Sequence, residues 1–388
     1  MKLLFTIIAC VGIITNTFSQ NELVSLINNN TTTFNYHQNK FKGDGWNNIL
    51  SAIREHDNVL IGEDHFFEEI PLFISQISNE VHFDNFFCEI DAYTASIIQQ
   101  QLLNKDVKKV TNFISNYNTS FSFYALKKEF DLLQKFVSTK TNIIGLDQVT
   151  LTADRLIAFD LLQKTTHNKT QEIYKEIITN SKKHFDLFIT GKGSPYFFTN
   201  DFIKKLQQLD SLQISDYEKK AIDNILLSHK IYTTQSHQLR IQHMKHNILN
   251  HIQKISKQKN LFKYGAIHMN KSESLLGGFD IGNFIANISE ANYKKSLHLM
   301  IIGKDGIQGV PFKGMKTQKL NTTNGELQYL SPFFNSVTSD EWHVFKLNEI
   351  KKSIKKNNIQ VGKKLEKTIN GFDYLIVIPN VNPAKFLN

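Results

Sequence analysis

Short apolar runs alternate with helically spaced apolar residues through the first third of the chain. Three runs predict buried strands, at residues 58–61, 85–90 and 142–147. Apolar residues recur at helical spacing before and between them, in residues 46–56, 68–79, 92–103 and 123–138. Because helices alternate with strands at this spacing, the pattern indicates βαβ units and a parallel sheet.

The strand pattern stops in the middle of the chain. Residues 152–257 predict four or five helices, a block too long for one crossover, and therefore a helical insertion that caps the sheet. After this block, the pattern predicts strands at residues 261–267 and 296–302, followed by a loop rich in Gly, Asn and Thr at 303–328. A helix at 347–355 and a closing strand at 372–378 complete the chain. We therefore predict an α/β fold with a mostly parallel central sheet flanked by helices, in a single domain over residues 46–388.

The N-terminus has the features of an export signal. A lysine precedes the apolar stretch 3–14, which is too short to span a bilayer, and small and polar residues follow it. We predict a signal peptide, residues 1–19, cleaved after Ser19, and a periplasmic or extracellular protein. Cys10 leaves lipid attachment open as an alternative. Residues 20–45 are predicted to be a loose leader, and no second membrane segment is visible in the sequence.

Charge and cysteine content narrow the classes of partner. Lys and Arg total 45 against 36 Asp and Glu, a formal net charge of +9. The sequence has no Arg-rich stripe with interleaved aromatic residues, so we expect no nucleic-acid partner. The sequence favours solvated helix faces and loop ends for lysines such as Lys351, Lys355 and Lys363, and a basic surface that attracts acidic envelope polymers is the alternative. Cys88 alone remains after signal removal, so no intramolecular disulfide forms and an ordinary hydrophobic core must stabilise the protein.

Ionisable side chains stand where the predicted strands end. Glu63, Asp64 and His65 follow the first strand, Glu89 lies at the end of the second, and His268 follows residues 261–267. The carboxyl ends of parallel strands form the edge at which α/β proteins bind ligands. A charge there is costly to bury unless it is paired or used. We therefore expect these strand ends to form an active site.

Several of these strand-end residues also have a plain structural explanation, although Glu89 is harder to explain in this way. His65 fits a general base that takes a proton from water while Glu63 or Glu89 holds its other ring nitrogen, but it also fits a loop residue capping the next helix. Asp91 fits a helix cap, and capping or sheet-edge support is preferred for Asp147.

One helix face carries a further candidate. Arg240, Met244 and Asn247 follow one another at i, i+4 and i+7 on a single helix. Spacing alone favours a surface arginine beside a core methionine. The functional alternative is a guanidinium aimed at carboxylates or at a developing oxyanion.

The remaining motifs leave three schemes open. The sequence has no Gly-x-Ser-x-Gly elbow, P-loop or dinucleotide fingerprint, and Cys88 lies within a predicted strand, so water attack under histidine control is the economical mechanism. Glu63, His65, Glu89 and His268 also suit a divalent-metal hydrolase. A non-catalytic binder of haem or another planar ligand, with His65 or His268 as axial ligand, is the third.

Six motifs, taken in order, resemble the erythromycin esterase-like superfamily, which includes the ChaN-like proteins. Any one of them is weak, but together they span most of residues 46–383 in the right order. They are Ile61-Gly62-Glu63-Asp64-His65, the strand-end Glu89, Gly145-Leu146-Asp147, the helix Arg240–Asn247, Gly265-Ala266-Ile267-His268 with Gly282-Asn283-Phe284, and Phe372–Pro379.

The resemblance implies an α/β core with a helical insertion and, in the esterase branch, hydrolysis of a lactone ester without a metal. By that likeness His65 is the base, Glu63 and Glu89 support it, and Arg240 and His268 bind or polarise a small-molecule ester substrate. Two motifs depart from the esterase spelling. The first is one residue shorter and has Phe66 in place of a glycine, and the late motif has Gly265 in place of the first of two histidines. The shorter first motif is closer to the ChaN-like form.

Overall fold

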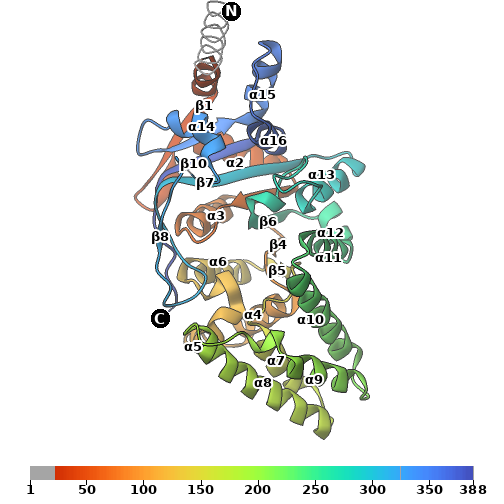
Figure 1. Ribbon diagram of the computed structural model, residues 1–388. Helices are drawn as coiled ribbons and strands as arrows, with labels where there is room; N and C mark the ends of the chain where they lie inside the picture. The colour runs from red at the N-terminus through yellow and green to blue at the C-terminus, as the bar shows by residue number, and fades with distance from the viewer. Residues whose placement is uncertain (1–21, 324, 388) are drawn as a thin grey trace, which may run out of the picture. The chain divides into compact units, whose positions relative to one another are not determined.

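The computed structural model describes residues 22–323 and 325–387, so the predicted signal peptide, residues 1–19, lies outside the described residues. The protein has the predicted α/β class, with a mostly parallel sheet flanked by helices (Figure 1). The chain divides into two compact units and passes repeatedly between them. The first contains residues 22–81, 264–309 and 317–383, and the second contains residues 82–263, 310–316 and 384–387.

The sheet of the first unit runs in the order β2-β1-β9-β10-β7-β3. β3 pairs in parallel with β7, and β7 in parallel with β10. β10, β9, β1 and β2 are joined by antiparallel pairs, and β8 adds antiparallel to β7. The strands are β1 Thr31–His37, β2 Lys40–Lys42, β3 Asn58–Glu63, β7 Ser296–Gln308, β8 Gln318–Lys319, β9 Trp342–Lys346 and β10 Tyr374–Val381.

Amphipathic helices accompany this sheet. In α2, Asp44–Glu55, the buried residues Trp46, Ile49 and Ile53 recur at helical spacing, which is why this segment forms a helix with one apolar face. The other helices of the unit are α3 Glu69–Glu80, η3 Ala266–His268, α13 Ile281–Ala291, η4 Gln328–Leu330, α14 Ser331–Asn335, α15 Leu347–Lys356 and α16 Lys363–Gly371.

The prediction of a loose leader over residues 20–45 is wrong for the described part of that segment. Residues 22–29 are helical, and the β1–β2 hairpin follows. Ile27 and Phe34 are fully buried. Phe34 joins an aromatic cluster in which its ring centroid lies 5.1 Å from Phe41 and 5.2 Å from Trp342. The segment's Asn and Thr content obscured these few apolar anchors, which pack against strands distant in sequence.

The second unit contains a short parallel sheet in the order β6-β4-β5. Asn85 begins β4 and is in register with Asn260 of β6 and Asn142 of β5. The three asparagines are hydrogen-bonded to one another through Asn85, at 2.9 and 3.1 Å. The strands are β4 Asn85–Cys88, β5 Asn142–Gly145 and β6 Asn260–Gly265, and the helices that precede the insertion are α4 Ala92–Asn104, α5 Val107–Tyr117, η1 Asn118–Ala125 and α6 Lys127–Ser138.

The insertion between β5 and β6 is helical, as predicted, and has a hydrophobic core of its own. Tyr174, Phe197, Leu209 and Ile222 are among the residues buried in this core. Such burial stabilises the helices independently of their intrinsic propensity. The helices are α7 Asp154–Lys164, α8 Asn168–Phe188, η2 Tyr196–Phe198, α9 Asn200–Asp210, α10 Asp216–Thr234, α11 His237–Leu249 and α12 Ile252–Lys257.

The structure also differs from the prediction at β7 and contains a strand, β9, that was not predicted. β7 continues to Gln308 and pairs with β8, so the predicted loop 303–328 begins as strand. β9 lacks a sequence signal because it is a short antiparallel strand between β1 and β10. Among the described residues, no helix has the length and hydropathy needed to cross a bilayer.

Candidate active site

The sequence-predicted site residues belong to both units. Glu63, His65 and His268 lie in the first, and Glu89 and Arg240 lie in the second. Each unit pairs its own candidates.

In the first unit, Glu63 and His65 form a hydrogen-bonded pair at the carboxyl end of β3. Glu63 is the last residue of the strand and is 4% exposed. His65 Nδ1 lies 2.8 Å from Glu63 Oε1, and the histidine side chain is 27% exposed. A carboxylate accepts and does not donate, so Nδ1 carries the proton and Nε2 is the nitrogen able to take one from water.

A close backbone approach shapes this strand end. Gly62 lies inside β3, which continues two residues beyond the strand predicted at residues 58–61. A Cβ at Gly62 would lie 2.9 Å from the Cα of Ala266, so only glycine lets η3 pack against the strand. Glycine is therefore required here by packing.

The turn after Glu63 is fixed on its other side by β7. Gln308 Nε2 donates to the His65 carbonyl oxygen at 3.0 Å and to Asp64 Oδ1 at 3.2 Å. Phe66 has a φ of +71°, a conformation that glycine adopts without strain and phenylalanine rarely adopts. Phenylalanine thus occupies a left-handed backbone position at the place where the esterase spelling of this motif has glycine.

A cavity of about 340 Å³ opens beside the pair. Glu63, Asp64 and His65 line it together with a mainly apolar wall. Burial raises the pKa of Asp64, and the neighbouring His65 opposes that rise. The wall includes Ala266, Ile267, Leu275, Met300, Ile302, Leu327, Tyr329 and Phe372. A small substrate with an apolar part fits such a wall.

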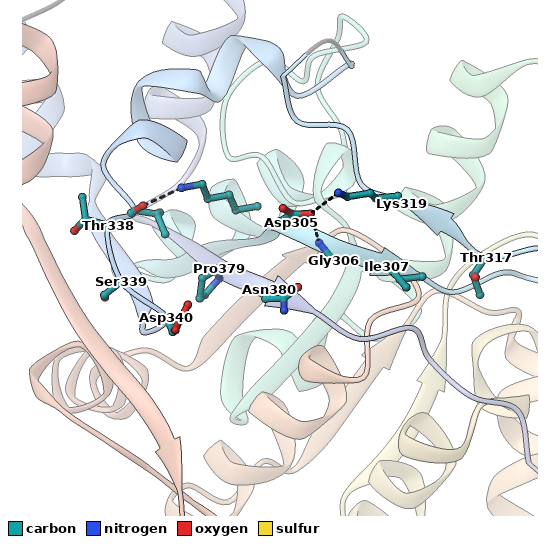
Figure 2. A pocket seen from close by; sticks show the side chains of 12 residues that line it. Asp305, Gly306, Ile307, Thr317, Lys319, Thr338, Ser339, Asp340, Pro379 and Asn380 are labelled. Atoms are coloured by element: carbon teal, nitrogen blue, oxygen red, sulfur yellow. Dashed lines mark hydrogen bonds and ion pairs between the residues drawn. The ribbon is translucent and has the colours of Figure 1, made fainter.

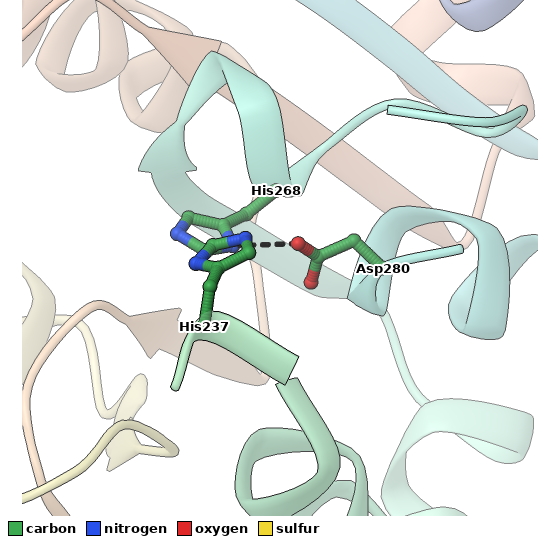
Figure 3. A group of neighbouring side chains, drawn as sticks. All are labelled: His237, His268 and Asp280. Carbon is green, nitrogen blue, oxygen red and sulfur yellow. Dashed lines mark hydrogen bonds and ion pairs between the residues drawn. The ribbon is translucent and has the colours of Figure 1, made fainter. Parts of the chain in front are cut away.

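His268 forms a different pair in the same unit. Its Nδ1 lies 2.9 Å from Asp280 Oδ2, and both residues are almost fully buried (Figure 3). Asp280 is the N-cap of α13, and its other oxygen accepts the Ile281 N–H at 2.6 Å. His268 is not among the residues lining the cavity beside His65. The carboxylate of Asp280 instead fixes the tautomer and orientation of a buried imidazole.

In the second unit, Arg240 is held by two carboxylates. Its Nε donates to Asp147 Oδ1 at 2.9 Å, and its Nη2 donates to Asp147 Oδ2 at 2.5 Å and to Glu89 Oε1 at 2.9 Å. Burial lowers the pKa of Arg240, but the two ion pairs outweigh burial and raise it, so the guanidinium is permanently charged. Asp147 therefore binds and orients Arg240, a role beyond the capping or edge support preferred from sequence.

The predicted face of α11 is confirmed. Met244 is fully buried, and Asn247 Nδ2 donates to the Leu146 carbonyl oxygen at 2.7 Å. The helix face and the end of β5 are thus connected by a side-chain hydrogen bond.

Asp91 caps α4 as predicted by accepting the N–H groups of Tyr93 and Thr94 at 3.0 and 2.9 Å.

Cys88 behaves as a core residue. It is fully buried in β4, and burial raises the pKa of its thiol to about 12. A neutral thiol is a poor nucleophile. The structure confirms the predicted position of Cys88 within a strand.

Sequence reasoning missed Asp280 and Gln308 as partners of site residues. Asp280 follows Gly-Gly-Phe and precedes an apolar run, which is an N-cap signal, but its pairing with His268 depends on tertiary structure. Gln308 had no signal because it lies in the part of β7 predicted as loop.

A second, larger hollow lies at the ends of β7 and β10 (Figure 2). This groove of about 820 Å³ is lined by polar residues that include Asp305, Lys319, Ser339 and Asn380. No histidine lines it. The acid–base pair of this unit therefore belongs to the smaller cavity.

These features define an α/β protein with a histidine–carboxylate pair at the end of a parallel strand. No family model and no curated protein matches the sequence. Solved structures do match over nearly the whole chain. A succinoglycan biosynthesis protein aligns with a TM-score of 0.59 at 12% identity, covering 94% of this chain and 98% of that one.

Two further structures agree. A Bacillus cereus protein aligns with a TM-score of 0.58 at 13% identity, over 95% of this chain and 99% of that one. A variant of an erythromycin esterase in its open conformation aligns with a TM-score of 0.57 at 14% identity, over 92% and 99%. The chain therefore has the fold of these proteins, and the resemblance drawn from the six motifs is confirmed at the level of the fold.

Proposed function

We propose that this protein is an exported hydrolase that cleaves an ester or lactone with a water molecule activated by His65, without a metal. The observation that carries the proposal is the 2.8 Å bond between His65 Nδ1 and Glu63 beside a cavity with an apolar wall. The fold shared with an erythromycin esterase supports the same reaction class.

In the proposed reaction, Nε2 of His65 removes a proton from water as the oxygen attacks the ester carbonyl carbon. The resulting imidazolium is stabilised by the Glu63 carboxylate, and the proton then passes to the leaving alkoxide. The apolar wall excludes bulk water from the acyl part of the substrate. Catalytic or binding roles for Glu89, Arg240 and His268 are proposed from the resemblance alone, and the variants Glu89→Gln, Arg240→Gln and His268→Ala test them in the same ester panel.

The test is turnover of a panel of esters and lactones of graded size by the purified full chain. Wild type is expected to hydrolyse at least one class, and His65→Ala to lose at least 100-fold in kcat while folding normally. His37→Ala is the matched control, because His37 is exposed at the end of β1. An unchanged rate in His65→Ala would remove His65 from the mechanism.

Two additional measurements separate the alternative schemes. Activity that disappears on chelation and returns with a divalent ion would favour the metal-dependent hydrolase. A Soret band on haem titration that is lost in the His65 or His268 variants would favour the binding protein instead.

A further inference from the structure

Most of the net charge of this protein lies in one short stretch of the first unit. Residues 346–367 contain eight lysines and two glutamates, a net +6 out of +9 for the whole chain. They form α15 and α16 and the turn between them. The two helices lie side by side, because Lys351 and Lys355 of α15 and Glu366 of α16 border a common groove of about 330 Å³ (Figure 1).

The lysines of α15 face solvent from one side of the helix. At 100° per residue, Lys351, Lys352, Lys355 and Lys356 fall within an arc of about 140°. All four are exposed, whereas Leu347 and Ile350 on the opposite side are buried. The fold therefore turns the apolar side inward and presents a cationic stripe outward.

Few acidic groups neutralise this surface. Lys352 pairs with Glu349 at 2.8 Å, and Lys367 pairs with Glu273 at 3.1 Å. Five exposed lysines form no ion pair with any residue in the described part of the chain: Lys351, Lys355, Lys356, Lys363 and Lys364. We call these five the basic face. Like charges held together without partners repel each other, and a polyanionic partner would relieve that repulsion.

We propose that the basic face attaches this protein peripherally to an anionic phospholipid bilayer. The charges are lysines, whose ammonium groups are compact point charges and do not make the bidentate contacts of arginine. They spread over two helices, as a planar array of headgroups requires. Clusters of four to eight basic residues on an amphipathic helix are the usual signature of such binding.

The same surface lacks the features of other polyanion sites. Among the described residues between 317 and 387, no large hydrophobic side chain is exposed, so this surface lacks the exposed aromatic rings on which bases and sugars stack. For the same reason, attachment is electrostatic and reversible and involves no insertion. The proposed membrane attachment does not depend on the proposed hydrolysis.

The test is partition of the full chain onto vesicles of phosphatidylglycerol and of phosphatidylcholine at low salt. The measured quantity is the ratio of the two partition constants, so any contribution of the N-terminal apolar segment cancels. The ratio is expected to be well above one and to fall toward one as salt rises, because the Debye length shrinks. A ratio near one at low salt would overturn the proposal.

Charge variants locate the surface. Neutralising Lys351, Lys355, Lys356 and Lys363 to glutamine is expected to lower the ratio by roughly 600-fold, about fivefold per lysine. The control changes four exposed lysines of the helical insertion in the same way, Lys169, Lys183, Lys204 and Lys219. It is expected to keep the ratio within a few fold. Equal losses in both variants would show that only net charge matters and would overturn the assignment.

A soluble polyanion identifies the remaining alternative. Heparin is expected to compete with vesicles without binding more tightly than they do. Binding of heparin through the basic face, with no preference for phosphatidylglycerol vesicles, would assign the surface to a soluble acidic polymer and refute membrane attachment.

Discussion

The sharpest prediction concerns Glu63→Gln, which keeps the shape of the side chain and removes its charge. Glu63 is 4% exposed, and its Oε1 lies 2.8 Å from His65 Nδ1. A hydrogen bond to a charged group contributes about 1.5–3 kcal/mol, which is roughly 10- to 150-fold in rate if it forms only as the imidazole becomes charged.

A second effect adds to the first. The glutamine amide is able to donate to Nδ1, which would place the ring proton on Nε2 and leave that nitrogen unable to accept a proton. Together the two effects predict a fall in kcat on the order of 10²- to 10⁴-fold, with little change in KM. Folding is expected to be unimpaired, since the variant replaces a buried charge with a neutral group.

The assay is steady-state hydrolysis of the best ester from the panel, with Asp64→Asn as the matched control. Asp64 is also an acid next to His65, but its carboxylate accepts from Gln308. Its loss is expected to change kcat by less than about fivefold, as for a neighbouring charge without a hydrogen bond to the ring. Retention of kcat within threefold in Glu63→Gln, or equal losses in both variants, would refute the pairing as the source of catalysis.

Three further outcomes concern stability, each measured by urea unfolding. Because φ at Phe66 is +71°, Phe66→Gly should be more stable than Phe66→Ala by about 1 kcal/mol, and the reverse order would contradict the strain. Burial raises the pKa of Asp154 from 3.8 to about 6, so its stabilising contribution is complete below about pH 4 and is lost as pH rises through 6. The free energy of unfolding of Asp154→Asn should therefore rise relative to that of wild type by up to roughly 3 kcal/mol between pH 4 and 7. A difference between the two proteins that does not change with pH would exclude the raised pKa. Lys263→Met removes the ion-pair partner that lies 2.8 Å from the buried Glu129 and should lower the free energy of unfolding by about 3–5 kcal/mol. The double variant Lys263→Met with Glu129→Gln should lose less stability than Lys263→Met alone. Strictly additive losses would show that the two residues are not coupled.

Much of the fold followed from local patterns. The strands that begin at Asn58, Asn85 and Asn142 and the helices between them were predicted because buried parallel strands are continuous apolar runs and amphipathic helices repeat every 3.6 residues. The β1–β2 hairpin and β9 escaped, since their stability depends on a few aromatic contacts such as Phe34 with Trp342. Those contacts join residues some 300 positions apart, which no local window detects.

The candidate site divides in the same way. Sequence alone determined which residues are available for chemistry, because a charged group beside a buried strand end needs a use or a partner. Tertiary structure decided the partners: Glu63 with His65, Asp280 with His268, and Asp147 and Glu89 with Arg240. Only the first pair lies two residues apart. The other pairs form because packing brings together strands, helix caps and helices that are distant in the sequence. A hydrogen bond requires two atoms within about 3 Å of each other, and the spacing of residues along the chain does not determine that distance.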